Sequence, residues 1–273
     1  MIDPTARCPR WLIDRIGDSG GSISFYRYMD LVLNDPDNGF YSTGKLNIGK
    51  NGDFCTSPSL SNDFARLLAI QVVDWLLDLE KSGIDSKLLS LIEIGPGEGT
   101  LSRDLIVAIA EIAPALICKI ELVLVELNVG MRRRQEKVVN NLEGINCRWS
   151  SIEDLILRPV TGVVIANEVL DAFPVERLVF SDNKVFRQGV SLKKINDEYS
   201  LEFVDLKPTS KIIKFLKESN SLLKIEFPPK DICNRWVTEW HCDVPSWFGD
   251  LSKVLIDGPL LVVDYAMESK RYY

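Results

Sequence analysis

Hydrophobic positions in the first third of the chain recur at the three- and four-residue spacing of helices. One apolar face lies within residues 25–33 and consists of Phe25, Tyr28, Met29, Val32 and Leu33. A second lies within residues 62–88 and consists of Phe64, Leu67, Leu68, Val72, Trp75, Leu76 and Leu79. We expect two amphipathic helices, the first capped by Ser24. Residues 40–60 between them have no period and are rich in Gly, Ser, Thr and Asn, which predicts a long loop.

The centre of the chain alternates short apolar runs with helical segments. Strands are predicted over residues 88–94, 119–127, 146–149 and 162–166. Helices are predicted over residues 100–112 and 131–142. Strands separated by helices form right-handed crossovers, which give a mostly parallel sheet covered on both faces. The predicted fold class is therefore α/β, with a Rossmann-like, doubly wound sheet.

After residue 174 the pattern changes to short strands joined by turns. Runs at 175–180, 185–192 and 199–206 are connected by Asp182-Asn183 and Asn196-Asp197, which predicts an antiparallel meander. A helix over 210–223 follows, and residues 259–264 return to a strand. We expect a helical extension with a lid loop over 1–87, a cofactor-binding core over 88–174, an α+β insertion on the substrate side over 175–230, and a return to the core with a fifth strand over 231–273.

Composition narrows the class of protein. The 273 residues are 46% hydrophobic and 26% charged, which is the balance of a soluble globular chain. A net charge of −7 disfavours binding to a phosphate backbone, so nucleic acid is not an expected partner. Six cysteines without a C-x-x-C pair and a single histidine, His241, give no metal site. We expect a cytoplasmic protein without membrane insertion, because the N-terminus has no secretory apolar segment and carries acids that a transit peptide avoids.

A glycine motif marks the first chemical site. Glu93-x-Gly95-x-Gly97-x-Gly99 lies where a strand gives way to a helix. Glycines let the backbone pass close to a ligand, and free N–H groups at a helix start favour an anionic group. The next strand ends at Glu126, where an acid accepts hydrogen bonds from both ribose hydroxyls. This pattern predicts a nucleotide-type site, with a bare tight turn and a solvated glutamate as the alternatives.

Two cofactor classes fit this pattern. Nicotinamide enzymes carry G-x-G-x-x-G near the N-terminus, whereas this chain has G-x-G-x-G after about 90 residues of other sequence. The motif resembles the first motif of Rossmann-like methyltransferases that use S-adenosyl-L-methionine. That resemblance implies that the cofactor's amino acid lies on the glycine loop, its ribose on Glu126 and its adenine beside Ser151, Ile152 and Glu153.

Further motifs narrow the resemblance. The N-terminal ones are Ser22-Ile23-Ser24-Phe25, Tyr28-Met29, Asp35-Pro36, Gly39-Phe40-Tyr41-Ser42-Thr43-Gly44 and Gly52-Asp53-Phe54-Cys55-Thr56-Ser57-Pro58. The later ones are residues 92–101, Val125-Glu126, residues 166–175, Glu226 before Pro228, and Asp264-Tyr265-Ala266. Together they look like the MidA family of S-adenosylmethionine-dependent methyltransferases. That family includes a mitochondrial complex I assembly factor that methylates an arginine of a partner subunit.

The resemblance implies methyl transfer to an arginine of a protein, with a subunit of a respiratory or NDH-type complex as the partner. Asn167, Glu168 and Asp171 follow the fourth predicted strand, where open α/β sheets place ligands. Glu168 and Asp171 are suited to hold a planar guanidinium, although all three residues are equally suited to capping a turn. The other hypotheses are a weakly active or inactive assembly scaffold, a small-molecule methyltransferase and, more remotely, a nicotinamide enzyme.

The loop over residues 39–58 is predicted to be a lid that covers the cofactor. The loop residues predicted to contact the cofactor supply hydrogen-bond donors, a carboxylate and an aromatic ring. They are Thr43, Gly44, Asp53, Phe54, Thr56 and Ser57. A packed surface loop is the alternative.

Three further expectations concern the rest of the chain. Arg132-Arg133-Arg134 is interpreted as a solvated helix face. Trp236, Trp240, His241 and Trp247 are expected on helices that flank Pro245, with a packing role. The MidA family continues into an antiparallel pair of strands after Asp264-Tyr265-Ala266, so we expect those C-terminal strands to be missing here.

Overall fold

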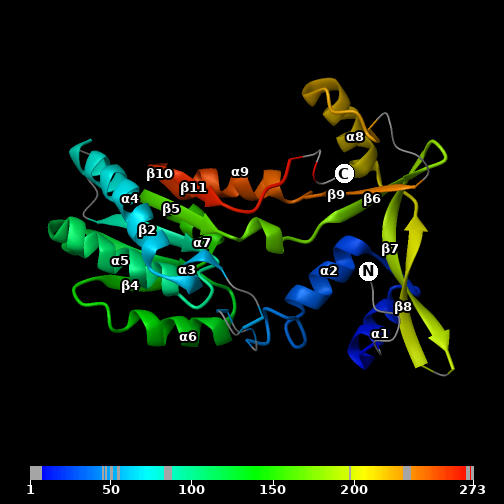
Figure 1. Cartoon of the computed structure of the whole chain (residues 1–273), viewed down its shortest axis with the longest axis horizontal. Coiled ribbons are helices and arrows are strands. Elements are labelled where there is room, and N and C mark those ends of the chain that lie inside the picture. The colour runs from blue at the N-terminus through cyan, green and yellow to red at the C-terminus, as the bar shows by residue number, and fades with distance from the viewer. Residues whose placement is uncertain are drawn as a thin grey trace. The chain divides into compact units, whose positions relative to one another are not determined.

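The chain folds into two compact units, each of which uses two separate stretches of sequence (Figure 1). In the computed structural model, unit 1 comprises Met1–Gly39 and Phe173–Asp243, and unit 2 comprises Phe40–Ala172 and Val244–Tyr273. The structure describes residues 8–44, 46, 48–49, 52–53, 56–82, 88–196, 198–229, 235–268 and 271. No helix in this described part combines the length and hydropathy needed to cross a membrane.

Unit 2 is built on a six-stranded parallel sheet, which confirms the predicted α/β fold. Its strands are β2 (Leu89–Ile94), β3 (Ile120–Val125), β4 (Asn146–Ser150), β5 (Val160–Asn167), β10 (Leu255–Asp257) and β11 (Leu260–Val263). From β2 the chain moves outward through β3 to β4, and then crosses back to β5, whose other edge pairs with β10 and β11. The direction of winding therefore reverses between β2 and β5.

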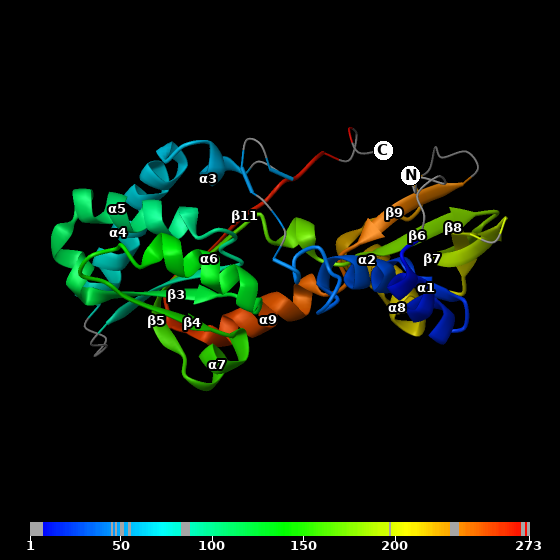
Figure 2. The same cartoon turned by 90° about the horizontal axis from the view of Figure 1, so that it is seen from below.

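Helices cover both faces of this sheet (Figure 2). The helices α4 (Asp63–Lys81), α5 (Thr100–Ile112) and α6 (Val129–Val139) contribute to one apolar cluster. On the opposite face α7 (Ile152–Leu157) and α9 (Val244–Val254) pack against alternate residues of the same strands. The short elements are α3 (Ser57–Leu60) and the 3₁₀ turns η1 (Pro114–Lys119) and η2 (Leu170–Ala172). Strands β2, β3 and β5 read as continuous apolar runs because both of their faces are buried.

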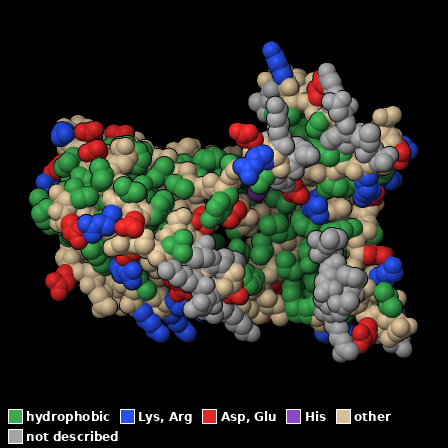
Figure 3. Space-filling view, viewed as in Figure 1, with side chains coloured by type: hydrophobic (Ala, Val, Ile, Leu, Met, Phe, Trp, Pro, Cys, Tyr) green, Lys and Arg blue, Asp and Glu red, His purple; other side chains and the backbone are tan. Residues whose placement is uncertain are grey.

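The apolar face of α4 differs in part from the predicted one. Leu67 was placed on the inward face, yet its side chain is 70% exposed and Ile70 beside it is 55% exposed. The buried positions include Ala65 and Ala69, small residues that pack in the apolar cluster shared with α5. Figure 3 shows the hydrophobic side chains that reach the surface over this region. Periodicity predicted the helix but not which of two apolar sides faces the core.

Unit 1 is an antiparallel sheet with three helices, and it confirms the predicted meander. Its strands are β1 (Ser22–Ser24), β6 (Glu176–Ser181), β7 (Lys184–Ile195), β8 (Glu198–Leu206) and β9 (Trp236–Trp240). Its helices are α1 (Arg10–Asp18), α2 (Phe25–Asn34) and α8 (Ser210–Leu223). Asp182 and Asn183 both have positive φ, as a two-residue hairpin turn requires. Ser24 caps α2 as predicted, accepting a hydrogen bond from the Arg27 amide.

The prediction that the tryptophans near Pro245 lie on helices is wrong for two of them. Trp236 and Trp240 lie on strand β9, and only Trp247 lies on a helix, α9. Their packing role is confirmed, because the rings of Trp240 and Phe215 stack with centroids 4.1 Å apart and Trp236 is buried beside Phe180. Trp236, Thr238 and Trp240 follow the two-residue period of a strand, which is the signal that the sequence interpretation missed.

Candidate functional site

The strands of unit 2 bring their carboxyl ends to one edge of the sheet. The residues that directly follow four of these strands are Gly95, Glu126, Glu168 and Asp264. Open α/β sheets bind ligands at this edge, where the strand order reverses. Here that point lies between β2 and β5, and a Cβ atom built on Gly95 would lie only 3.1 Å from Cγ2 of Val169. The glycine motif and the Asn167–Asp171 segment are therefore direct neighbours at this edge.

The glycine loop adopts backbone conformations that other residues rarely adopt. Gly95, Gly97 and Gly99 have φ values of 62°, 53° and 82°, and Gly99 is the N-cap of α5. A Cβ on Gly97 would lie 2.9 Å from Cδ1 of Ile48, so a side chain there would be strained in its backbone conformation and would also displace the end of Ile48. The loop leads directly into the N-terminus of α5, as predicted for a site that binds an anionic group.

Glu93 lies beneath this loop rather than at its surface. Its side chain is 4% exposed, and its carboxylate accepts hydrogen bonds from the hydroxyl and the backbone N–H of Ser102 in the first turn of α5. Burial raises the pKa of Glu93 to about 7, against the opposing effect of these hydrogen bonds. Glu93 is therefore placed to hold the glycine loop against the start of the helix.

Glu126 lies at the end of β3 with both carboxylate oxygens engaged. Oε1 accepts a hydrogen bond of 2.8 Å from the Asn128 amide, and Oε2 accepts one of 3.1 Å from Nε2 of Gln135. Partial burial raises its pKa, while these hydrogen bonds lower it. The backbone N–H of Leu127 is a third donor to this carboxylate, which has about four acceptor sites and therefore keeps capacity for a ligand hydroxyl.

The three residues predicted to lie beside the adenine, Ser151, Ile152 and Glu153, differ in burial and in contacts. Ile152 begins α7 and packs against the apolar cluster under the carboxyl ends of the strands. Glu153 is exposed on the first turn of the same helix. Ser151 caps this helix by accepting a hydrogen bond of 3.1 Å from the Asp154 amide. Ile152 is thus part of the same edge, and Glu153 lies at its solvent side.

The segment after β5 is a strained turn with an unused acceptor. Glu168 is not a glycine, yet it has φ 54°, a conformation that costs free energy and is often found at functional sites. Its Oε1 accepts a 3.4 Å hydrogen bond from the Ser57 amide, and Tyr265 also donates to its carboxylate. Oδ1 of Asn167 is buried and has no hydrogen-bond partner among the described residues. The turn therefore presents a fixed carboxylate and a free amide oxygen.

Asp264 fixes the shape of this turn, and the sequence analysis did not propose it as a site residue. Its Oδ2 accepts hydrogen bonds from the backbone amides of Leu170 at 2.7 Å and Asp171 at 3.3 Å. Its Oδ1 accepts one of 2.8 Å from the Tyr265 amide. The acceptor that caps the turn is therefore Asp264, and the side chain of Asp171 is exposed.

Negative charge gathers at this turn. The carboxylate of Glu168 raises the pKa of Tyr265, with smaller contributions from Asp171 and Asp264. Burial and then the charge of Asp171 raise the pKa of Tyr41. Three carboxylates and two phenols thus surround one region, which suits a cation, and a planar guanidinium in particular. Among the described residues no group of side chains has the makings of a metal site.

The first part of the predicted lid is attached to α6. Asn128 donates from its side-chain amide to the carbonyl oxygens of Tyr41, at 3.1 Å, and Ser42. Arg134 donates to the carbonyls of Gly44, at 2.6 Å, and Leu46. Thr43 donates its hydroxyl to Phe40 at 3.5 Å. This part of the loop is therefore packed onto the cofactor edge, and closure over a ligand stays a prediction.

The second part of the predicted lid leads into α3. Thr56 is the N-cap of this short helix and forms a capping box with Ser59, and the amide of Ser57 points to Glu168. Asp53 is exposed. Phe54, the predicted aromatic group of the lid, lies outside the described residues.

Helix α6 carries site residues that the sequence analysis missed. The interpretation of Arg132–Arg134 as a solvated face holds only for the exposed Arg133. Arg132 donates to the carbonyl of Glu126 at 2.6 Å, and Arg134 pairs with Glu98 of the glycine loop at 2.7 Å. The completely buried Gln135 belongs to the inner stripe of the helix. A glutamine in the stripe between Met131 and Val139 was the available signal.

Gln135 connects three parts of the site. Its Nε2 donates to the carbonyl of Gly97 at 2.8 Å as well as to Glu126. Its Oε1 accepts a hydrogen bond of 2.8 Å from the indole of Trp149. Every polar atom of this buried side chain is used, so it fixes the glycine loop relative to Glu126.

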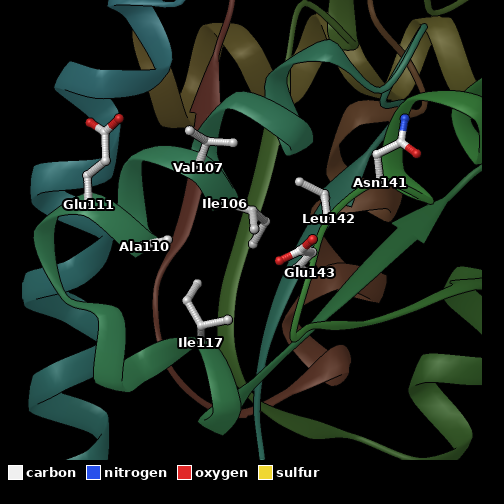
Figure 4. Close-up of a pocket in the computed structure, with 8 residues that line it drawn as sticks. All are labelled: Ile106, Val107, Ala110, Glu111, Ile117, Asn141, Leu142 and Glu143. Carbon is white, nitrogen blue, oxygen red and sulfur yellow. The ribbon is translucent and has the colours of Figure 1, made fainter.

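A separate hollow of about 430 Å³ lies away from this edge (Figure 4). Ile106, Ile117 and Leu142 surround it, and it is formed by the second half of α5, by η1 and by residues 141–143. Its polar groups are Glu111, Asn141 and Glu143. The hollow shares no residue with the glycine loop or the acidic turn, and it is not part of the candidate site.

Comparisons with known proteins agree with this geometry. Residues 67–273 match a family described as "Putative S-adenosyl-L-methionine-dependent methyltransferase". The mitochondrial protein arginine methyltransferase NDUFAF7 of Xenopus laevis is 36% identical over 211 residues, 70% of this chain and 44% of that protein. Its Xenopus tropicalis counterpart is 32% identical over 183 residues, 59% and 40% of the two chains. The chain thus spans less than half the length of these curated relatives.

A solved structure covers almost the whole chain. It is a protein from Burkholderia thailandensis, described as a "likely methyl transferase", bound to S-adenosyl-homocysteine. The two structures have a TM-score of 0.78 and 29% sequence identity, over 96% of this chain and 63% of that one. The second structure of a protein from the same organism gives a TM-score of 0.74 at 28% identity.

Proposed function

The chain belongs to the S-adenosyl-L-methionine-dependent methyltransferase family that its residues 67–273 match, and from this premise we propose that it transfers a methyl group from S-adenosyl-L-methionine to an arginine side chain of a protein. The observation that carries the proposal is the position of the acidic turn. Glu168 and Asp171 lie in the segment that adjoins the glycine loop at the same edge of the sheet, where a bound cofactor and an acceptor would meet.

The residues at the edge fit the cofactor. The backbone of Gly95–Gly99, whose three glycines all have positive φ and lead into the N-terminus of α5, would hold its amino-acid part. The carboxylate of Glu126 would accept from the ribose, and Ile152 would border the adenine. The buried Oδ1 of Asn167 is an acceptor that lacks a donor within the described structure. When bound, the cofactor supplies a methyl group that its sulfonium already activates.

The carboxylates of the turn would orient the acceptor. A guanidinium that hydrogen-bonds to Glu168 and Asp171 is held in one plane, which directs a nitrogen along the line of attack. Transfer of the methyl group to that nitrogen would release a proton from it, and we assign Glu168 as the carboxylate that would accept this proton. Asp264 acts indirectly, because it holds the backbone of the turn.

The relatives support the choice of acceptor. The Xenopus proteins carry the name protein arginine methyltransferase, and the acidic turn suits a guanidinium better than a neutral small molecule. The resemblance to the MidA family extends the proposal to a subunit of a respiratory or NDH-type complex as the partner.

The test is methyl transfer from S-adenosylmethionine labelled in its methyl group to the proteins of a host-cell lysate. The label is expected in protein, and acid hydrolysis of that protein should release it as methylarginine. Gly97→Val should abolish both S-adenosylhomocysteine binding and transfer, because a β-branched residue is strained at the φ of 53° that this turn requires. Glu168→Gln should leave binding within about threefold of the wild type and reduce transfer by about a hundredfold or more.

Two results would contradict the proposal in different ways. Label confined to low-mass products would indicate a small-molecule methyltransferase. Binding of the cofactor without any labelled protein would indicate a scaffold that keeps the fold without turnover.

A further inference from the structure

The contacts of Arg134 carry an inference about how the site is held together. We infer that Arg134 is a positioning residue that latches a cover segment, residues 41–44, 46 and 48, to the glycine loop, and that this latch sets the affinity for the adenosyl cofactor. The inference rests on the proposed function, because it concerns the cofactor of that same reaction. Arg134 acts on the site through two backbone carbonyls and Glu98.

The guanidinium of Arg134 joins two separate segments. Nη1 donates to Oε1 of Glu98 at 2.7 Å and to the carbonyl of Leu46, and Nη2 donates to the carbonyl of Gly44 at 2.6 Å. The side chains of Arg134 and Glu98 are only 30% and 26% exposed, so the pair is partly shielded from water. A planar guanidinium fork reaches acceptors on both sides at once, which the single ammonium group of lysine does less well.

The cover segment lies against the glycine loop as a packed element. Leu46 is 3% exposed, and Cδ1 of Ile48 occupies the space next to Gly97. Gly44 approaches Gly130 closely, since its Cβ would lie 3.6 Å from Cα of that residue. Asn128 holds the start of the segment through the carbonyls of Tyr41 and Ser42. Arg134 is therefore a further attachment point of the segment, and its guanidinium also reaches Glu98 of the glycine loop.

This arrangement links the order of the cover segment to binding. Glu98 lies within the Gly95–Gly99 turn, so Arg134 holds both walls of the proposed cofactor site in one arrangement. Without the guanidinium, a cofactor would have to order the cover segment as it bound, and the entropy lost would weaken its affinity. With the guanidinium in place that ordering is already complete.

The test is calorimetric titration of the full chain with S-adenosylhomocysteine. Arg134→Ala should weaken the affinity about tenfold or more, the effect of losing charge-assisted hydrogen bonds. Arg134→Lys should restore part of the loss, since it keeps the charge and some donors. Arg133→Ala removes the same charge from the exposed neighbouring position of α6 and should bind like the wild type.

Hydrogen exchange of the backbone amides gives a second readout that needs no ligand. Exchange between residues 41 and 46 should be faster in Arg134→Ala than in Arg133→Ala, while the strands of the sheet stay protected. Wild-type affinity and wild-type exchange in Arg134→Ala would overturn the latch. A wild-type protein that binds no S-adenosylhomocysteine would instead overturn the proposed function, and with it the claim about affinity.

Discussion

At the scale of single residues, three glutamates of the same edge have roles set by their surroundings. Glu93 is buried against Ser102 and supports the glycine loop. Glu126 is partly buried, and N–H groups of Asn128 and Gln135 fix its two oxygens. Glu168 lies in a left-handed turn beside two other carboxylates. Burial and hydrogen bonding, rather than residue type, therefore separate a structural acid from the proposed ribose acceptor and from the proposed substrate-facing group.

Glu93 predicts a pH dependence of stability. Its pKa is about 7 in the folded protein and 4.5 in the unfolded reference, so the folded state holds the proton more tightly. Its contribution is complete below pH 4.5 and is lost as the pH rises through 7. From pH 5.5 to pH 8 this group alone should lower the free energy of unfolding by about 2 kcal/mol. Urea unfolding at the two pH values measures this change.

The matched variant for this prediction is Glu93→Gln, which keeps an acceptor for Ser102 and removes the titration. Its free energy of unfolding should lack this fall between pH 5.5 and pH 8. If wild type and variant change by the same amount over that range, Glu93 does not titrate there, and the assigned role is wrong.

At the scale of elements, α6 shows what a sequence pattern can and cannot predict. Periodicity predicts the helix, and three consecutive arginines do point in different directions. The pattern contains no information on which direction meets a neighbouring loop, so Arg132 and Arg134 were assigned to solvent. Arg134 donates to the carbonyl of Gly44, which is 90 residues away in the sequence. Arg132 donates to the carbonyl of Glu126, which directly follows strand β3. Only Gln135, a polar residue in an apolar stripe, signals a buried contact locally.

Gln135 predicts a loss of both stability and binding. Gln135→Leu would leave the Trp149 indole N–H and the Gly97 carbonyl without their partners in a buried site. The free energy of unfolding should fall by about 2 kcal/mol, and the affinity for S-adenosylhomocysteine by about tenfold. Urea unfolding and calorimetry measure the two effects.

The control for this substitution is Gln71→Leu, the same change at an exposed position of helix α4. It should alter stability by less than about 0.5 kcal/mol. Equal effects of the two substitutions would show that the hydrogen bonds of Gln135 contribute nothing specific.

At the scale of the whole molecule, the sequence predicts the parallel sheet well and the pairing of distant segments poorly. Strands β2, β3 and β5 are long apolar runs, and their carboxyl ends necessarily meet at one edge. That is why Gly95, Gly97, Glu126 and Glu168 were predicted together. Strand β1 has only three residues, too few for a period, and pairs with β7, far along the chain. Asp264 was missed for a related reason, because its partners at Leu170 and Asp171 belong to another strand's turn.

The net charge of −7 and the acidic turn agree with the proposed acceptor. This negative charge favours the approach of a basic protein segment by electrostatic attraction. Such attraction does not require the segment to bind tightly before the reaction. Methyl transfer at this turn therefore requires one spatial relation, in which the sulfur of the bound cofactor faces the carboxylates of the turn.

A crystal structure of the protein with S-adenosylhomocysteine tests this relation most directly. We expect the amino-acid part of the ligand along Gly95–Gly99, the ribose hydroxyls on Glu126, and the sulfur facing the carboxylates of Glu168 and Asp171. A ligand bound elsewhere, or one whose sulfur faces away from both carboxylates, would contradict the account.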